Sequence, residues 1–98
     1  MTITSERDGS TLSIALAGRL DTTSAPELEE MLKTSLDGVS RLILDLAELE
    51  YISSAGLRVL LSVYKRMKER DGMKLINVSE ENMDVFSLTG YTEFLDIE

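Results

Sequence analysis

Hydrophobic and polar positions alternate near the start of the chain. Every second residue of 12–16 is apolar, with polar or small residues between, as is typical of a strand with one buried face. A shorter stretch, residues 3–5, precedes it, and Asp8-Gly9 between the two is a strong signal for a two-residue hairpin. The pattern predicts two antiparallel strands joined by a tight turn.

The next segment, residues 24–38, has the pattern of an amphipathic helix. Ser24 and Glu27 have the spacing of a capping box. Pro26 falls in the first turn, and Gly38 is placed to end the helix in a left-handed conformation. One face of this helix is apolar: Leu28, Met31, Leu32 and Leu36. The helix is therefore expected to cover one side of a sheet.

A nearly continuous apolar run, "RLILDLAEL" at residues 41–49, follows this helix. Such a run is typical of a strand buried on both faces, so we expect it at the centre of the sheet. After residue 56 the apolar spacing becomes helical again. The buried face of this second helix is expected to hold Leu57, Leu60, Leu61, Tyr64 and Met67. Its exposed face is expected to hold Arg58, Ser62, Lys65 and Glu69.

The last third of the chain continues the alternation of strands and helices. "MKLINV" at residues 73–78 reads as a strand, a helix opens at Ser79 and stops at Gly90, and "TEFLDI" at 92–97 can return as an edge strand. The predicted order is ββαβαβα with a possible final β. Such alternation implies parallel crossovers onto a mixed β-sheet with helices mainly on one face. The fold class is α/β, and residues 1–98 are expected to form one domain.

Composition and charge narrow the range of partners. The chain of 98 residues has 18 acidic and 10 basic side chains, and the net charge of −8 disfavours nucleic acid and anionic lipid surfaces. No apolar run approaches the roughly 18 residues of a membrane span, and the first residues lack the pattern of a secretory signal. We therefore expect a cytoplasmic protein that binds neither nucleic acid nor membrane.

The chain contains no His and no Cys, which excludes the common catalytic arrangements that need an imidazole or a thiol. Neither a Ser-His-Asp nor a Cys-His arrangement can be assembled, and no glycine-rich phosphate-binding motif occurs. Acidic clusters could hold a hard cation, although such clusters also stabilise helix N-termini: Glu27, Glu29 and Glu30, and Glu80 and Glu81. We expect no catalytic residue, no metal, no cofactor and no small-molecule substrate.

The segment "YISSAGL", residues 51–57, lies where a parallel strand ends and a helix begins, the edge at which functional loops gather in α/β sheets. Ser53 or Ser54 can simply cap the helix by accepting hydrogen bonds from free backbone N–H groups. Alternatively, the first helical turn attracts anions and would tolerate a phosphate on Ser54. Ala55 and Gly56 leave that hydroxyl open to the active site of another protein. The residues alone leave both roles open.

Three stretches together resemble the STAS domain family, and more closely its bacterial anti-sigma factor antagonists: "AGRLDTTSAPEL", "LILDLAELEYISSAGLRVLLSVYKRMK" and "KLINVSEENMDVFSLTGYTEFLDI". The resemblance covers essentially all of residues 1–98. The motif D-L-x-x-L-x-x-[IM]-[DS]-S-x-G-L is specific in combination with the upstream G-x-L-D, although either alone would be weak. The expected fold is therefore a single STAS-like domain.

This resemblance implies a regulatory switch, not an enzyme. Antagonists of this family bind an anti-sigma factor that is also a serine kinase, which frees the sigma factor. The kinase then uses ATP to phosphorylate a serine at a helix start, and a phosphatase reverses the modification. By motif position the phosphorylated serine is Ser54, and Ser53 stands where many members have Asp. The expected partner-binding residues are Asp21, Thr22, Ser53, Gly56, Leu57 and Arg58.

Plainer roles and other functions stay open. Asp21 can support the turn after a strand, Leu57 can pack in the core, and Arg58 can belong to a solvated helix face. A STAS domain can also serve as an accessory or scaffold subunit of a signalling assembly or of a lipid transporter. A small metal-dependent enzyme that uses carboxylates is a third possibility, which the absence of His disfavours.

Overall fold

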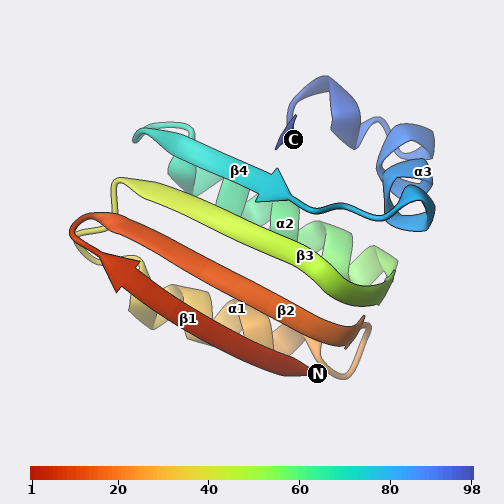
Figure 1. Ribbon diagram of the computed structural model, residues 1–98, viewed down its shortest axis with the longest axis horizontal. Helices are drawn as coiled ribbons and strands as arrows, with labels where there is room; N and C mark the ends of the chain where they lie inside the picture. Colours follow the sequence, from red (N-terminus) through yellow and green to blue (C-terminus); the bar gives the residue numbers. More distant parts are fainter.

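The computed structural model describes all residues, 1–98, and is drawn in Figure 1. Its elements follow the predicted order, with one 3₁₀ turn (Tyr91–Glu93) before the last strand. The strands are β1 (Thr2–Asp8), β2 (Thr11–Leu20), β3 (Arg41–Ile52), β4 (Gly72–Ile76) and β5 (Asp96–Ile97). The helices are α1 (Ala25–Ser35), α2 (Ser54–Met67) and α3 (Glu80–Leu88). None of the helices is both long and apolar enough to cross a membrane.

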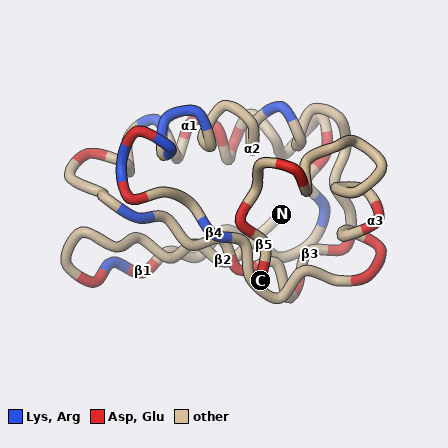
Figure 2. Tube along the Cα trace, turned by 90° about the horizontal axis from the view of Figure 1, so that it is seen from above, with Lys and Arg blue, Asp and Glu red and all other residues tan.

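The five strands form one mixed sheet in the order β1-β2-β3-β4-β5. Only β1 and β2 are antiparallel, and the other neighbouring pairs are parallel. Helices α1 and α2 lie side by side over one face of this sheet, and α3 lies near its end (Figures 1 and 2). The predicted α/β class and the placement of the helices on one face are confirmed.

The hairpin between β1 and β2 turns one residue later than predicted. Asp8 pairs with Thr11 across the strands, so Gly9 and Ser10 form the turn. Gly9 has a φ of 63°, whereas Ser10 is not left-handed. A glycine at the first of the two turn positions is the pattern of a type II′ turn. The Asp8-Gly9 signal identified the hairpin but assigned the wrong pair of turn residues.

Strand β3 occupies the centre of the sheet as predicted, but only one of its faces is fully buried. Leu42, Leu44 and Leu46 lie beneath the helices and are inaccessible to solvent. Ile43 and Asp45 face the other side of the sheet and are partly exposed. The prediction of burial on both faces is wrong because no helix covers that second side (Figure 2).

The second half of β3 does not keep the simple alternation of a strand. Its register against β2 shifts twice, and each shift adds one residue to β3. Such β-bulges change which side chains face the core. As a result Leu49 and Ile52 are buried three residues apart, while Glu50 and Tyr51 between them are both exposed.

The buried face of α2 is rotated relative to the prediction. Leu61 and Tyr64 are only half-buried, and Val59 and Val63 are buried in their place. These valines line the contact between α2 and α1, which the helical period of a single segment does not reveal. The other predicted core residues of this helix are buried: Leu57, Leu60 and Met67. Its predicted polar face is exposed: Arg58, Ser62, Lys65 and Glu69.

Candidate functional site

The turn between β3 and α2 gives its two serines different roles. Ser53 is the N-cap, with extended backbone, and its hydroxyl oxygen accepts a hydrogen bond of 3.2 Å from the Gly56 N–H. Ser54 is the first residue of α2, and its side chain is exposed. The Ser54 hydroxyl makes no hydrogen bond within the chain, whereas Ser53 satisfies the helix start. Ser54 Oγ is therefore free to react with a group from outside.

The first turn of α2 packs directly against the end of β2. The Ser53 N–H donates a hydrogen bond of 2.8 Å to the carbonyl oxygen of Leu20. A Cβ atom on Gly56 would lie 2.7 Å from Leu20 Cγ and 3.0 Å from the Leu20 carbonyl oxygen. Only glycine permits this approach, which brings the loop between β2 and α1 beside the start of α2.

Two of the residues predicted to contact the partner are buried in the structure. Gly56 is buried, and Leu57 exposes only 7% of its surface. Leu57 packs in the core because the helical period places it on the same face as Leu60. Gly56 contributes by lacking a side chain. Neither residue offers a side chain for a partner to contact.

Asp21 organises the turn that leads into α1. Its Oδ1 atom accepts hydrogen bonds from the backbone N–H groups of Thr23, at 3.0 Å, and Ser24, at 3.1 Å. The bond from the Ser24 amide is the largest cause that holds the pKa of the Asp21 carboxyl below its ordinary value, and Arg19 acts in the same direction. The residues alone allowed this supporting role for Asp21, and the structure shows it.

The capping box predicted for Ser24 and Glu27 does not form. The Ser24 hydroxyl donates to the Arg19 carbonyl oxygen at 2.6 Å and accepts from the Asp21 N–H at 2.9 Å, so it makes no cap hydrogen bond to α1. The Asp21 carboxylate instead accepts from the Ser24 N–H, the group to which a box would have directed Glu27.

Arg19 and Tyr51 form a contact beside Asp21 that sequence analysis missed. They are register partners on β2 and β3, and the guanidinium carbon lies 4.3 Å from the centre of the Tyr51 ring. Arg19 Nε also lies 3.9 Å from Asp21 Oδ2. Tyr51 is 41% exposed, so this cation–π pair is part of the outer surface. The two bulges in β3 place Tyr51 opposite Arg19, and the residue pattern does not predict these bulges.

Thr22 and Arg58 are brought together in a shallow groove next to Ser54. The groove has a volume of about 280 Å³ and lies between the start of α1 and the start of α2, with Ala55, Pro26 and Val59 among its walls. Asp21 is not part of it, and lies with Arg19 in a neighbouring hollow of about 430 Å³. The predicted contact residues therefore fall on two adjacent surfaces.

The C-terminal segment supports α2 from the other side. The Tyr91 hydroxyl donates a hydrogen bond of 3.0 Å to the Leu57 carbonyl oxygen. Burial of the Tyr91 side chain raises the pKa of its hydroxyl. The Phe94 ring lies 4.9 Å from the rings of both Tyr64 and Tyr91. Sequence analysis missed this cluster because aromatic residues in a short irregular segment carry no periodic signal.

The site offers an accessible hydroxyl and a place for negative charge. A phosphate on Ser54 would lie at the positive end of the α2 dipole, with Arg58 one turn further along the same helix. The sequence contains two acidic clusters that could serve as cation ligands: Glu27, Glu29 and Glu30, and Glu80 and Glu81. The structure contains no group of three or more acidic residues placed to hold a metal ion.

The chain belongs to the STAS domain family, whose model matches residues 2–98. The anti-sigma-B factor antagonist of Bacillus subtilis is 33% identical over 87 residues, which cover 88% of this chain and 80% of that relative. The resemblance found in the sequence motifs is thereby confirmed.

Solved structures show the same fold. An anti-sigma factor antagonist from Mycobacterium paratuberculosis superimposes with a TM-score of 0.87 at 23% identity, over 98% of this chain and 83% of that one. The Bacillus cell fate determinant SpoIIAA, in its phosphorylated form, gives a TM-score of 0.77 at 21% identity, over 99% of this chain and 91% of that one.

Proposed function

We propose that this protein is an anti-sigma factor antagonist that is switched off by phosphorylation of Ser54. The observation that carries the proposal is the exposed Ser54 hydroxyl, free of hydrogen bonds, at the first residue of α2. The name of the Bacillus subtilis relative supports the role, and the solved phosphorylated SpoIIAA supports a phosphate in this family. The unmodified protein binds an anti-sigma factor and so frees a sigma factor.

The partner is an anti-sigma factor that also acts as a serine kinase. It transfers the γ-phosphoryl group of ATP to Ser54 Oγ, releasing ADP, while the hydroxyl proton passes to a base of the kinase. A phosphatase restores the hydroxyl. The protein acts in the bacterial cytoplasm as a binding protein and substrate and catalyses no reaction itself. The outer surface around Ser54, with Thr22, Arg58 and Asp21, is the surface that the partner covers.

Phosphorylation weakens this binding through charge. The modification adds about −1.5 to −2 charges at neutral pH to a surface that loses its water when the partner docks. Burying an anion without full compensation costs several kcal/mol. Because about 1.4 kcal/mol corresponds to a tenfold change in affinity, a loss of a hundredfold or more from one modification is expected. No refolding is needed, since Ser54 is already exposed.

Tandem mass spectrometry after incubation with the cognate kinase and ATP tests the proposal. We expect a single phosphate on Ser54, none on the Ser54→Ala variant, and normal modification of Ser54 in the Ser53→Ala variant. The Ser53→Ala variant is the matched control because it removes the neighbouring hydroxyl and leaves the acceptor. A phosphate found on Ser53, or no phosphate with a kinase that is active on another substrate, would contradict the assignment.

A further inference from the structure

Helix α2 carries a charge opposite to that of the whole molecule. The chain has a net charge of −8, yet α2 contains Arg58, Lys65 and Arg66 and no acidic residue. Figure 2 shows basic segments along the layer of helices that lies over the sheet. None of the three side chains forms an ion pair within the chain, where only Arg19, Lys33 and Lys74 do so.

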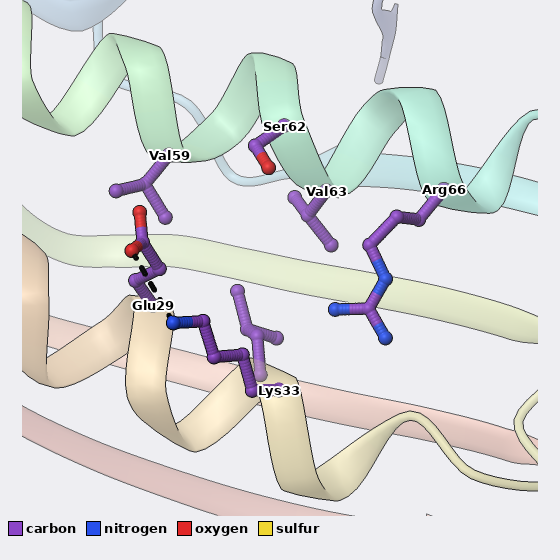
Figure 3. Close-up of a pocket in the computed structure, with 7 residues that line it drawn as sticks. Glu29, Lys33, Val59, Ser62, Val63 and Arg66 are labelled. Carbon is purple, nitrogen blue, oxygen red and sulfur yellow. Dashed lines mark ion pairs between the residues drawn. The ribbon is translucent and has the colours of Figure 1, made fainter.

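One of these cations, Arg66, lines a recess between α1 and α2 together with Lys33 of α1. Figure 3 shows Arg66 reaching from α2 toward α1, where Lys33 lies beside Glu29. The recess has a volume of about 270 Å³, and Val59, Val63 and Leu32 line it. These three residues are almost fully buried, so the recess exposes little apolar surface, and its polar rim is what a partner would meet.

The recess adjoins the groove that contains Thr22 and Arg58. Glu29 and Val59 line both hollows and so lie where the two meet. We call the groove and the recess together the α1–α2 trough. Ala55, the residue after Ser54, lines one end, and basic side chains lie at both ends.

The charge of the α1–α2 trough is only partly balanced by its own surroundings. Lys33 Nζ lies 3.9 Å from Glu29 Oε1, and both groups are more than half exposed, so this pair is weak. Lys33 and Arg66 also lie in the last turns of their helices, where cations stabilise the negative end of the dipole. Arg58 lies in the first turns of α2, where a cation has no such stabilising role.

We propose that the α1–α2 trough receives an acidic segment of the anti-sigma factor. This inference rests on the proposed function and names the chemistry of the partner surface. A basic trough on an acidic protein is complementary to a negatively charged segment and repels a basic one. Acidic side chains of that segment lie against Arg58 at one end and against Lys33 and Arg66 at the other.

The same geometry gives phosphorylation a second way to release the partner. A phosphate on Ser54 lies one helical turn from Arg58, at a spacing that allows an ion pair along the helix. The phosphate then neutralises Arg58 and repels the acidic segment that enters the α1–α2 trough at that end. Charge repulsion therefore adds to the cost of burying the phosphate.

Binding kinetics of charge-reversed variants with the purified cognate anti-sigma factor test the proposal. The Lys33→Glu/Arg66→Glu double variant reverses the far end of the trough, and Lys65→Glu is the control, because Lys65 lies on α2 but outside the trough. At about 50 mM salt we expect the double variant to bind at least about tenfold more weakly, mainly through slower association. At about 500 mM salt this difference should shrink, because exposed charges are screened. Lys65→Glu should stay within about threefold of wild type.

Melting curves of each variant separate a binding role from a structural one. If the reversed charges prevent folding, the double variant Lys33→Gln/Arg66→Gln can be compared with Lys65→Gln. These variants remove the positive charges without adding negative ones. A trough variant that binds no more weakly than its Lys65 control overturns the acidic-segment proposal and leaves the proposed function intact. Failure of the wild-type protein to bind the anti-sigma factor would overturn both.

Discussion

The starts of α1 and α2 are built on the same plan and use their serines differently. Each helix follows a strand that ends at the same edge of the sheet, and each begins just after a serine. At α1, Ser24 is 7% exposed, and its hydroxyl bonds to backbone groups of Arg19 and Asp21. At α2, Ser53 caps the helix while Ser54, one residue later, points to solvent without a partner.

The difference shows that the backbone conformation and the neighbouring groups decide what a serine does. At α1 the carboxylate of Asp21 accepts from the N–H groups of Thr23 and Ser24, and the Ser24 hydroxyl turns inward to the carbonyl oxygen of Arg19. At α2 no carboxylate is present, and Ser53 accepts from the helix instead. The side chain of the second serine, Ser54, is then not needed to cap the helix, and its hydroxyl is surplus to the hydrogen bonding of the fold. Such a hydroxyl can be modified without breaking a contact of the fold.

The largest expected effect comes from placing a charge on the surplus hydroxyl. Ser54→Asp adds about one negative charge, whereas Ser54→Ala removes the acceptor and adds none. If charge drives release, calorimetric titration should show that the Asp variant binds the anti-sigma factor about a hundredfold more weakly, while the Ala variant binds nearly as wild type. Equal losses in both variants would mean that the hydroxyl itself is a binding contact.

A second test breaks the packing that brings the two helix starts together. Gly56→Ala places a methyl group against Leu20, where the backbone oxygen cannot move far. Overpacking costs about 1–3 kcal/mol, which should exceed the gain of up to about 1 kcal/mol from the better helix propensity of Ala. Denaturant unfolding should show lower stability. The control is Ser62→Ala on the exposed side of α2, for which we expect stability equal to or above that of wild type.

The order of elements and the family motif could be predicted because they depend on local signals. Strand alternation and helical spacing located the three α-helices and the first four strands, and the sequence around Ser54 placed that residue at a helix start. Of the edge strand expected at 92–97 only Asp96–Ile97 forms, after a 3₁₀ turn that was not predicted. The buried Val59 and Val63, the pairing of Arg19 with Tyr51, and the Tyr91 bond to α2 could not be predicted. Each depends on how distant segments pack or on bulges that shift the register of β3.

The distinction between Ser53 and Ser54 also needed the structure. Both residues are serines at the same helix start, and capping by either one fits the residue pattern. Only the backbone conformation decides, because the N-cap has extended backbone while the next residue is already helical. The same limit explains the failed capping box of Ser24 and Glu27, which has the right spacing and the wrong backbone.

A third test measures this distinction as a difference in stability. Ser53→Ala removes the acceptor of the Gly56 N–H and should lower the free energy of unfolding by about 1 kcal/mol. Ser54→Ala removes a hydroxyl without a partner and should change it by no more than a few tenths of a kcal/mol, as is usual for surface positions. Parallel urea unfolding of the two variants checks the order. Equal losses of stability in the two variants would show that both hydroxyls contribute to capping α2.

The smallest expected effect separates the charge of Asp21 from its shape. Asp21→Asn keeps an oxygen that can accept from Thr23 and Ser24 but removes the charge, whereas Asp21→Ala removes both. Because folding lowers the pKa of this carboxyl from its ordinary value of 3.8, the ionised group stabilises the fold above that pH. The stabilisation is lost as the pH falls below 3.8 through the lower folded-state pKa. Wild type should therefore melt slightly above Asp21→Asn at pH 7, and the two should converge in acid, while Asp21→Ala should melt lowest at neutral pH. A constant gap between wild type and Asp21→Asn down to the acid limit would show that the shape of the side chain, and not its charge, supports the turn.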